Sequence, residues 1–237
     1  MNQNYLEMQK VLTETLGLKF PPVAVSIIRR PIDLPKGVPE LEKPMFYCAM
    51  VKHAMNGNVF FAREGMHGCK RGAAALGLGG IPEDERTGEF YVNKSSFESL
   101  RAATRTVVES PALEAGSVYA TLLAPLGMTP MDPDVVLVEA SPRRVLELIH
   151  AAIFRKGGWV SSTMSAPRQV CGALTVRPYL GDINVSIACE SARMAAKQIG
   201  LEYADEGLII GIPTERMRTI AENIGRIGYV KMRQMKK

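Results

Sequence analysis

Apolar residues along this chain follow a helical spacing in some segments and form short continuous runs in others. From Tyr5 to Leu16 they recur every three or four positions, which predicts a helix that stops at Gly17. The uninterrupted apolar run at residues 23–28 predicts a buried strand. Four prolines and one glycine in residues 31–44 predict a loop.

Two later segments share one plan, in which an apolar strand runs directly into an amphipathic helix. Residues 134–142 lead into a helix at 143–154, and residues 206–213 lead into a second helix with Met217 on its inner side. The other expected elements are helices at 48–55 and 97–107, strands at 59–61, 118–123 and 135–138, and short apolar runs at 173–176 and 183–187.

This pattern predicts a mixed α/β fold of the α+β kind, with strand–helix units. We expect a single compact domain over residues 1–237, built from two related halves at residues 20–125 and 126–237. No Pro-, Gly- or Ser-rich linker of the kind that separates independent domains interrupts the chain.

Four cysteines form two separated pairs, one in each half. Cys48 and Cys69 have 20 residues between them, and Cys171 and Cys189 have 17. The second cysteine of each pair precedes a segment of small residues that ends at Gly-Leu. If the halves pack face to face, four thiolates converge and could hold an iron–sulfur cluster or zinc.

The second cysteine of each pair is expected at the junction of a strand and a helix. There the helix dipole and free backbone N–H groups stabilise a thiolate and lower its pKa. Lys70 and Arg71 add positive charge beside Cys69, whereas Glu190 opposes this effect beside Cys189.

Three basic side chains and one glycine are candidates to contact a cofactor or an anion near the cysteines. Positive charge near a cluster stabilises its reduced form and can hold a small anion. Glycine lets the backbone approach a ligand closely. The candidates are Lys70, Arg71, Arg168 and Gly172.

Two other interpretations of the cysteines stay open at this stage. A Cys₂His₂ zinc site within the first half would use Cys48, His53, His67 and Cys69, although the second half has no matching histidine. Alternatively, all four cysteines are small apolar core residues, since the short C-x-x-C spacing typical of metal sites is absent.

Composition narrows the location and the partners of this chain of 237 residues. No apolar run approaches the length of a membrane span, and the N-terminus lacks a secretory signal, so we expect a cytoplasmic protein with reduced thiols. The net charge of +5 suits an anionic small molecule or an acidic protein partner. An aromatic content of 6% and the lack of a nucleic-acid-binding motif argue against nucleic acid.

Several of these residues also carry a resemblance to a known family. The stretches Tyr47-Cys48, Ala54–Gly57, Gly68–Gly72 and Leu76-Gly77, together with Cys171-Gly172 and Cys189, resemble the uncharacterised family DUF169. Members of that family are frequent in archaea and anaerobic bacteria, which would fit an oxygen-sensitive cluster. The resemblance supplies no activity.

The first hypothesis is therefore a metal-binding protein with one [4Fe–4S] cluster, which transfers electrons to a redox protein or binds a small anion. Its ligands would be Cys48, Cys69, Cys171 and Cys189. The second hypothesis is a non-redox module that binds an anionic metabolite and holds no metal, and the third is a zinc-dependent enzyme. The sequence names no substrate or reaction, and it leaves the oligomeric state, including a homo-oligomer, open.

Overall fold

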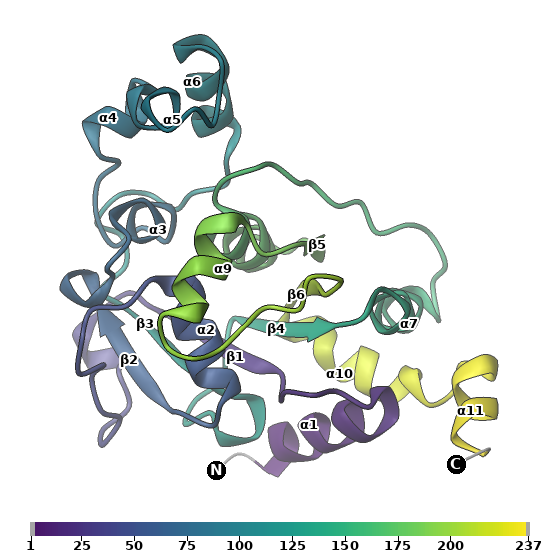
Figure 1. The fold of residues 1–237 in the computed structure, drawn as a ribbon. Coiled ribbons are helices and arrows are strands. Elements are labelled where there is room, and N and C mark those ends of the chain that lie inside the picture. The colour runs from purple at the N-terminus through teal and green to yellow at the C-terminus, as the bar shows by residue number, and fades with distance from the viewer. Residues whose placement is uncertain (1–2, 236–237) are drawn as a thin grey trace.

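The computed structural model describes residues 3–235, and a six-stranded antiparallel sheet lies at its centre (Figure 1). The strand order is β2-β3-β1-β4-β6-β5. The strands are β1 (Val23–Ile28), β2 (Phe60–Arg63), β3 (Ala120–Pro125), β4 (Val135–Ala140), β5 (Asn184–Ser186) and β6 (Leu208–Pro213). This arrangement confirms the predicted mixed α/β fold.

Helices account for most of the remaining regular structure. They are α1 (Gln3–Leu16), α2 (Tyr47–Met55), α3 (Lys70–Ala75), α4 (Glu83–Arg86), α5 (Glu89–Asn93), α6 (Leu100–Glu109), α7 (Pro142–Ile153), α8 (Arg177–Tyr179), α9 (Glu190–Lys197), α10 (Thr214–Ile224), α11 (Gly228–Gln234) and a π-helix, η4 (Gln169–Val176). Helices α4, α5 and α6 form a small lobe that stands away from the sheet, above α3 in Figure 1.

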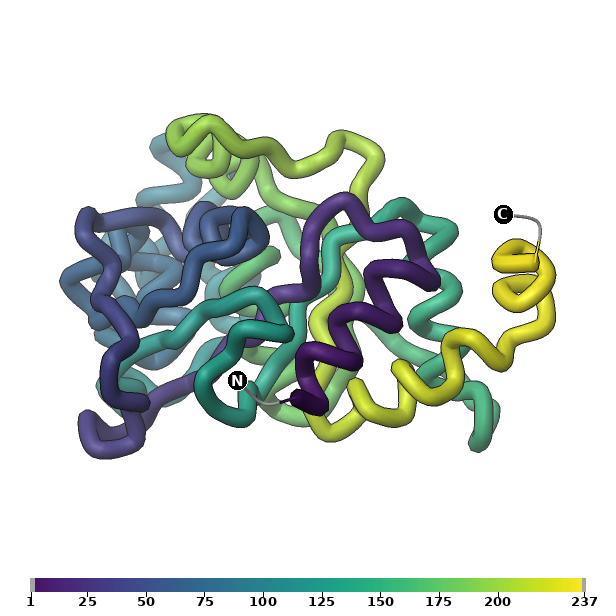
Figure 2. Tube along the Cα trace, turned by 90° about the horizontal axis from the view of Figure 1, so that it is seen from below, coloured from purple at the N-terminus to yellow at the C-terminus, as the bar shows by residue number. Residues whose placement is uncertain are grey.

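Helices cover both faces of the sheet, because side chains along each strand alternate between the two faces. On β4, Val135 and Leu137 face one core, whereas Val136 and Val138 face the other. The first core is closed by α2, α3, η4 and α9, and the second by α1, α7, α10 and α11. Figure 2 shows α1 and α10 side by side on the second face.

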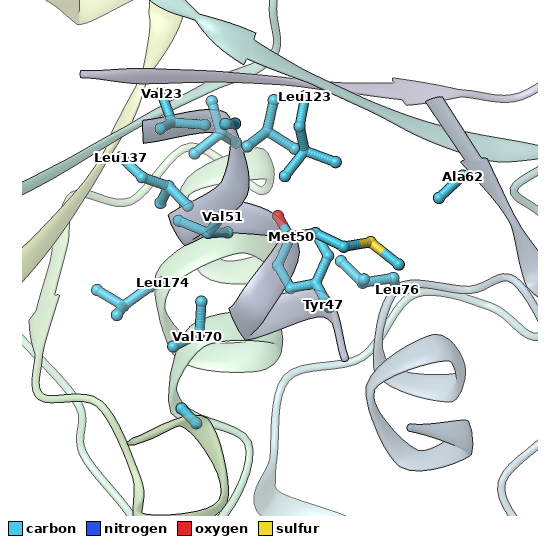
Figure 3. Close-up of a cluster of buried hydrophobic side chains, with 14 of the residues drawn as sticks. Val23, Tyr47, Met50, Val51, Ala62, Leu76, Leu123, Leu137, Val170 and Leu174 are labelled. Carbon is cyan, nitrogen blue, oxygen red and sulfur yellow. The ribbon is translucent and has the colours of Figure 1, made fainter. Parts of the chain in front are cut away.

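Helix α2 is the centre of the first core and fixes the position of the cysteine-bearing segments. Met50 and Val51 are fully buried between the sheet and η4 (Figure 3). The Tyr47 hydroxyl also lies 3.0 Å from the Thr175 hydroxyl of η4, a buried hydrogen bond. Apolar packing and this hydrogen bond therefore hold α2 and η4 together on one side of the sheet.

The strand order is the same in the two predicted halves when each is counted from the centre of the sheet. From the centre of the sheet outward, the strands of the first half follow the order β1-β3-β2. Those of the second half follow the corresponding order β4-β6-β5 on the other side. The two first strands, β1 and β4, pair with each other at the centre. Each half also places its first cysteine before its second strand and its second cysteine after it. The duplication itself stays a prediction.

The apolar run at residues 173–176 belongs to η4, which packs tightly against β6. A Cβ atom added at Gly211 would lie 2.7 Å from Pro178 Cγ and would overlap the Leu174 carbonyl oxygen. That oxygen belongs to the backbone of η4 and cannot move aside cheaply. Glycine is therefore required at this point of β6, because only a bare backbone lets the π-helix lie on the sheet.

We expect Gly211→Ala to lower the free energy of unfolding by about 3 kcal/mol, at the upper end of the usual cost of overpacking a core. Urea titration followed by circular dichroism measures this change. Gly225→Ala is the matched control, because a Cβ at Gly225 meets nothing within 4 Å. Equal stability of the two variants would contradict the close approach.

Candidate metal centre

All four cysteines line one cavity of about 560 Å³ on the first face of the sheet. Each is a free, partly exposed thiol. The cavity lies between segments that are far apart in sequence, since one cysteine comes from the start of each of α2, α3, η4 and α9. The fold therefore brings the two cysteine pairs to one cavity.

Each cysteine also lies at the start of its helix. Cys48 is the second residue of α2 and Cys171 is the third residue of η4, while Cys69 and Cys189 are the residues that cap α3 and α9. Backbone N–H groups are unpaired in the first turn of a helix and favour negative charge. One such contact is direct, because Gly72 N donates to Cys69 Sγ at 3.4 Å.

Gly72 lies next to two of the sulfur atoms. A Cβ atom built there would be 3.8 Å from Cys69 Sγ and 3.9 Å from Cys171 Sγ. These two thiols come from different halves of the chain, and both lie close to Gly72 in α3. The absence of a side chain at Gly72 leaves the space between them open.

Burial makes the bare thiolates costly. Burial is the main cause that raises the pKa of Cys171 to about 12, and the neighbouring thiols of Cys69 and Cys189 raise it further. Burial likewise raises the pKa of Cys48 well above its usual value, with smaller contributions from the other three thiols. Without a bound cation, both groups are therefore neutral thiols at physiological pH.

The three basic candidates lie at this cavity in different ways. Lys70 is exposed at its edge, whereas Arg71 is partly buried and Arg168 is 6% exposed. Gly172 is buried beside the carbonyl oxygen of Pro111, where an added Cβ would come within 3.1 Å. Its small size therefore serves the packing of η4 against another part of the chain, and it does not line the cavity.

The histidines of the alternative zinc set are engaged elsewhere. His53 packs against Phe60 and lies 3.3 Å from Asn58 through Nδ1. His67 Nε2 lies 3.2 Å from the Thr121 hydroxyl, and burial lowers the pKa of His67 to about 4. Within residues 3–235, no group of three or more His, Cys, Asp or Glu side chains could hold a metal ion. The structure therefore does not bring this zinc set together, and the four cysteines do not form such a group either.

Sequence reasoning missed two carboxylates of α4 that orient the arginines. Asp84 accepts a hydrogen bond of 2.7 Å from Arg71 Nη2, and Glu85 accepts one of 3.1 Å from Arg168 Nε. Glu85 is fully buried. The run Glu83–Arg86 has the composition of a solvated surface turn, so no signal in the sequence marked it as part of the site.

A buried ion pair behind the cysteines was also missed. Lys52 Nζ lies 2.6 Å from Glu139 Oε2, with side-chain exposures of 0% and 7%. The Lys52 ammonium lies over the rings of Phe20 and Tyr203, at 4.1 and 4.9 Å from their centroids. Burial lowers the pKa of Lys52, and the Glu139 carboxylate opposes that shift. Tyr203 in turn donates a hydrogen bond of 2.6 Å to the Cys48 carbonyl oxygen, so this pair supports the helix that carries Cys48.

The family model and the relative that match this chain are both described as uncharacterised. The family model DUF169, described as "Uncharacterised ArCR", matches residues 11–223. A protein of Methanocaldococcus jannaschii, named "Uncharacterized protein MJ0308", is 30% identical over 221 residues, which cover 92% of each chain. No solved structure matches the chain significantly. Between residues 3 and 235, no helix has both the length and the apolar character to cross a bilayer. The match over most of its length shows that the chain belongs to the DUF169 family.

Proposed function

We propose that this protein holds one iron–sulfur cluster, of the [4Fe–4S] type, and uses it to transfer electrons or to act on a small anion bound nearby. The cluster would be held by the thiolates of Cys48, Cys69, Cys171 and Cys189. The observation that carries the proposal is that four thiols from four separate segments line a single cavity. Four cysteine thiolates are the usual ligand set of such clusters.

The four thiols are close enough to affect one another electrostatically. They share one cavity, and Cys48 and Cys171 are each affected electrostatically by the other cysteines. Yet no three of the described His, Cys, Asp or Glu side chains are grouped so that they could hold a metal ion. That finding includes the four cysteines, so the support for the cluster is their shared cavity and their mutual electrostatic effect.

The charges around the cavity also suit a bound cluster. Its lining carries four basic side chains and one acidic side chain, namely Lys70, Arg71, Lys94, Arg168 and Glu190. Four thiolates bring negative charge into a partly buried place, and their protons are lost only when a cation replaces them. Nearby positive charge offsets that cost and favours the reduced form of the cluster.

This function implies a reducing location, such as the cytoplasm, and a redox protein that exchanges electrons with the cluster. A surface open to that partner exists beside the cysteines, because all four are partly exposed. The non-redox module remains the second candidate, since the raised pKa of Cys171 and Cys48 is also what buried structural thiols show.

Anaerobic purification followed by iron, sulfide and zinc analysis tests the proposal. We expect about four iron and four sulfide ions per chain and a brown protein with broad visible absorption. A colourless protein without metal would refute the cluster and favour the binding module. Stoichiometric zinc in a colourless protein would favour the zinc enzyme.

A further inference from the structure

The cavity beside the cysteines contains arginine donors that no part of the protein satisfies. Among the described residues, Arg168 Nη1 and Nη2 and Arg71 Nε are buried and have no hydrogen-bond partner, and the same holds for the acceptor Glu85 Oε2. Buried guanidinium N–H groups are costly to leave unpaired, because they have lost water and gained nothing in exchange. Both arginines line the cavity, so a ligand there could satisfy them.

Neighbouring carboxylates hold the two arginines in place and leave part of each guanidinium free. Arg168 Nε donates a hydrogen bond of 3.1 Å to Glu85 Oε1, while Nη2 lies 3.0 Å from that oxygen in an ion pair without forming a hydrogen bond, and the Arg168 side chain is 3% exposed. Arg71 uses Nη2 for Asp84 and lies over the ring of Phe90. Because Asp84 and Glu85 are consecutive in α4, one short helix orients both guanidinium groups.

The backbone at Arg168 adds a second sign of a built site. Arg168 has a φ of +55° and precedes the π-helix η4. A residue with a side chain rarely adopts this left-handed conformation, and such strain is concentrated at functional sites. Glycine would adopt this conformation without strain.

The other lining residues indicate the shape and polarity of the ligand. Five aromatic side chains line the same cavity as the arginines: Phe46, Tyr47, Phe90, Tyr91 and Phe97. A volume of about 560 Å³ lies within the range of small-molecule sites. Arginine forks match the geometry of a carboxylate, while aromatic rings favour a flat apolar body.

We propose that this cavity binds a small organic carboxylate with an aromatic or otherwise flat apolar body, with Arg168 and Arg71 as its anion-binding residues. This inference deepens the small-anion part of the proposed function, but the binding itself does not require the cluster. The carboxylate would sit beside Cys171, which follows Arg168 by three residues on the same segment.

Calorimetric titration of the anaerobically purified full chain with benzoate tests the inference, with iron measured in every sample. We expect benzoate to bind, benzamide to bind at least about tenfold more weakly, and inorganic phosphate to bind more weakly than benzoate, because each lacks one half of the recognition. No binding of benzoate, or equal binding of benzamide, would overturn the inference.

Variants identify the residues. Arg168→Gln combined with Glu85→Gln removes both charges of the buried pair, and Arg71→Gln changes a partly exposed side chain that the fold tolerates more easily. Each should weaken benzoate binding about tenfold or more. Arg86→Gln is the matched control, because Arg86 is exposed on α4, pairs with Glu83 and does not line the cavity.

The two proposals fail separately in this experiment. Benzoate binding to a protein without iron would refute the cluster and keep the carboxylate site. An iron-loaded protein whose benzoate affinity is the same in the wild type, Arg71→Gln and the double variant would refute the site and leave the cluster in place.

Discussion

The Cys171→Ser variant is expected to lose its iron, from about four ions per chain to close to none, together with its visible absorption. Cys171 lies in the first turn of η4 and faces the cavity that the other three cysteines share. A serine hydroxyl is a harder and much less acidic donor than a thiol, so it binds the iron of a cluster far more weakly than a thiolate does. Iron and sulfide analysis after anaerobic purification measures the loss.

Two comparisons make this result specific. Ser191→Ala alters a side chain of the same cavity that is not a proposed ligand, and it should keep its full iron content. Zinc bound through Cys48, His53, His67 and Cys69 would not depend on Cys171 at all. A Cys171→Ser protein with undiminished iron and colour would end the four-ligand proposal.

Glu139→Leu is expected to lower the free energy of unfolding by about 3–5 kcal/mol, the usual cost of removing one partner of a buried ion pair. The change leaves the Lys52 ammonium, 0% exposed, without its carboxylate. The rings of Phe20 and Tyr203 attract that ammonium but cannot replace a partner at 2.6 Å. Urea unfolding followed by circular dichroism gives the difference.

The double variant Lys52→Met with Glu139→Leu separates the loss of the pair from damage to the fold. It removes both charges and should recover most of the lost stability, because apolar residues often replace a buried pair at little cost. Glu109→Leu is the surface control, since its pair with Arg105 is largely exposed and contributes less than about 1 kcal/mol. A double variant as unstable as Glu139→Leu would contradict this account.

Periodicity was sufficient for the strands of the sheet and for the long amphipathic helices. The predicted strand at residues 23–28 is β1, and the helix expected to end before Gly17 is α1. Both carry local signals, namely an apolar run after two prolines and a helical stripe before a glycine. Such signals depend on neighbours in sequence, which one chain is enough to reveal.

Local pattern failed where long-range packing decides the conformation. Residues 173–176 form a short apolar run that suits a buried strand or a buried helix equally. In the structure they are helical, and their backbone packs against Gly211, which lies far away in the sequence. The polar pairs Lys52–Glu139 and Arg168–Glu85 join residues more than 80 positions apart. The spacing of apolar residues along the chain gives no information about partners this far apart in sequence.

Only the part of the candidate site that depends on local sequence could be predicted. The two cysteine pairs follow from the repeated order of the halves, and the helix starts after Cys69 and Cys189 were expected from their flanking residues. The roles of Asp84 and Glu85 were not, because only the folded lobe turns a charged run toward two arginines.

The position of the cysteines along the chain determines when the site can be loaded during protein synthesis. Cys189 and α9 are followed by β6, which must pair with both β4 and β5 before the sheet is complete. A growing chain on the ribosome therefore displays Cys48 and Cys69 long before their counterparts exist. A cofactor held by all four thiols can therefore be fully bound only after Cys189 has been synthesised.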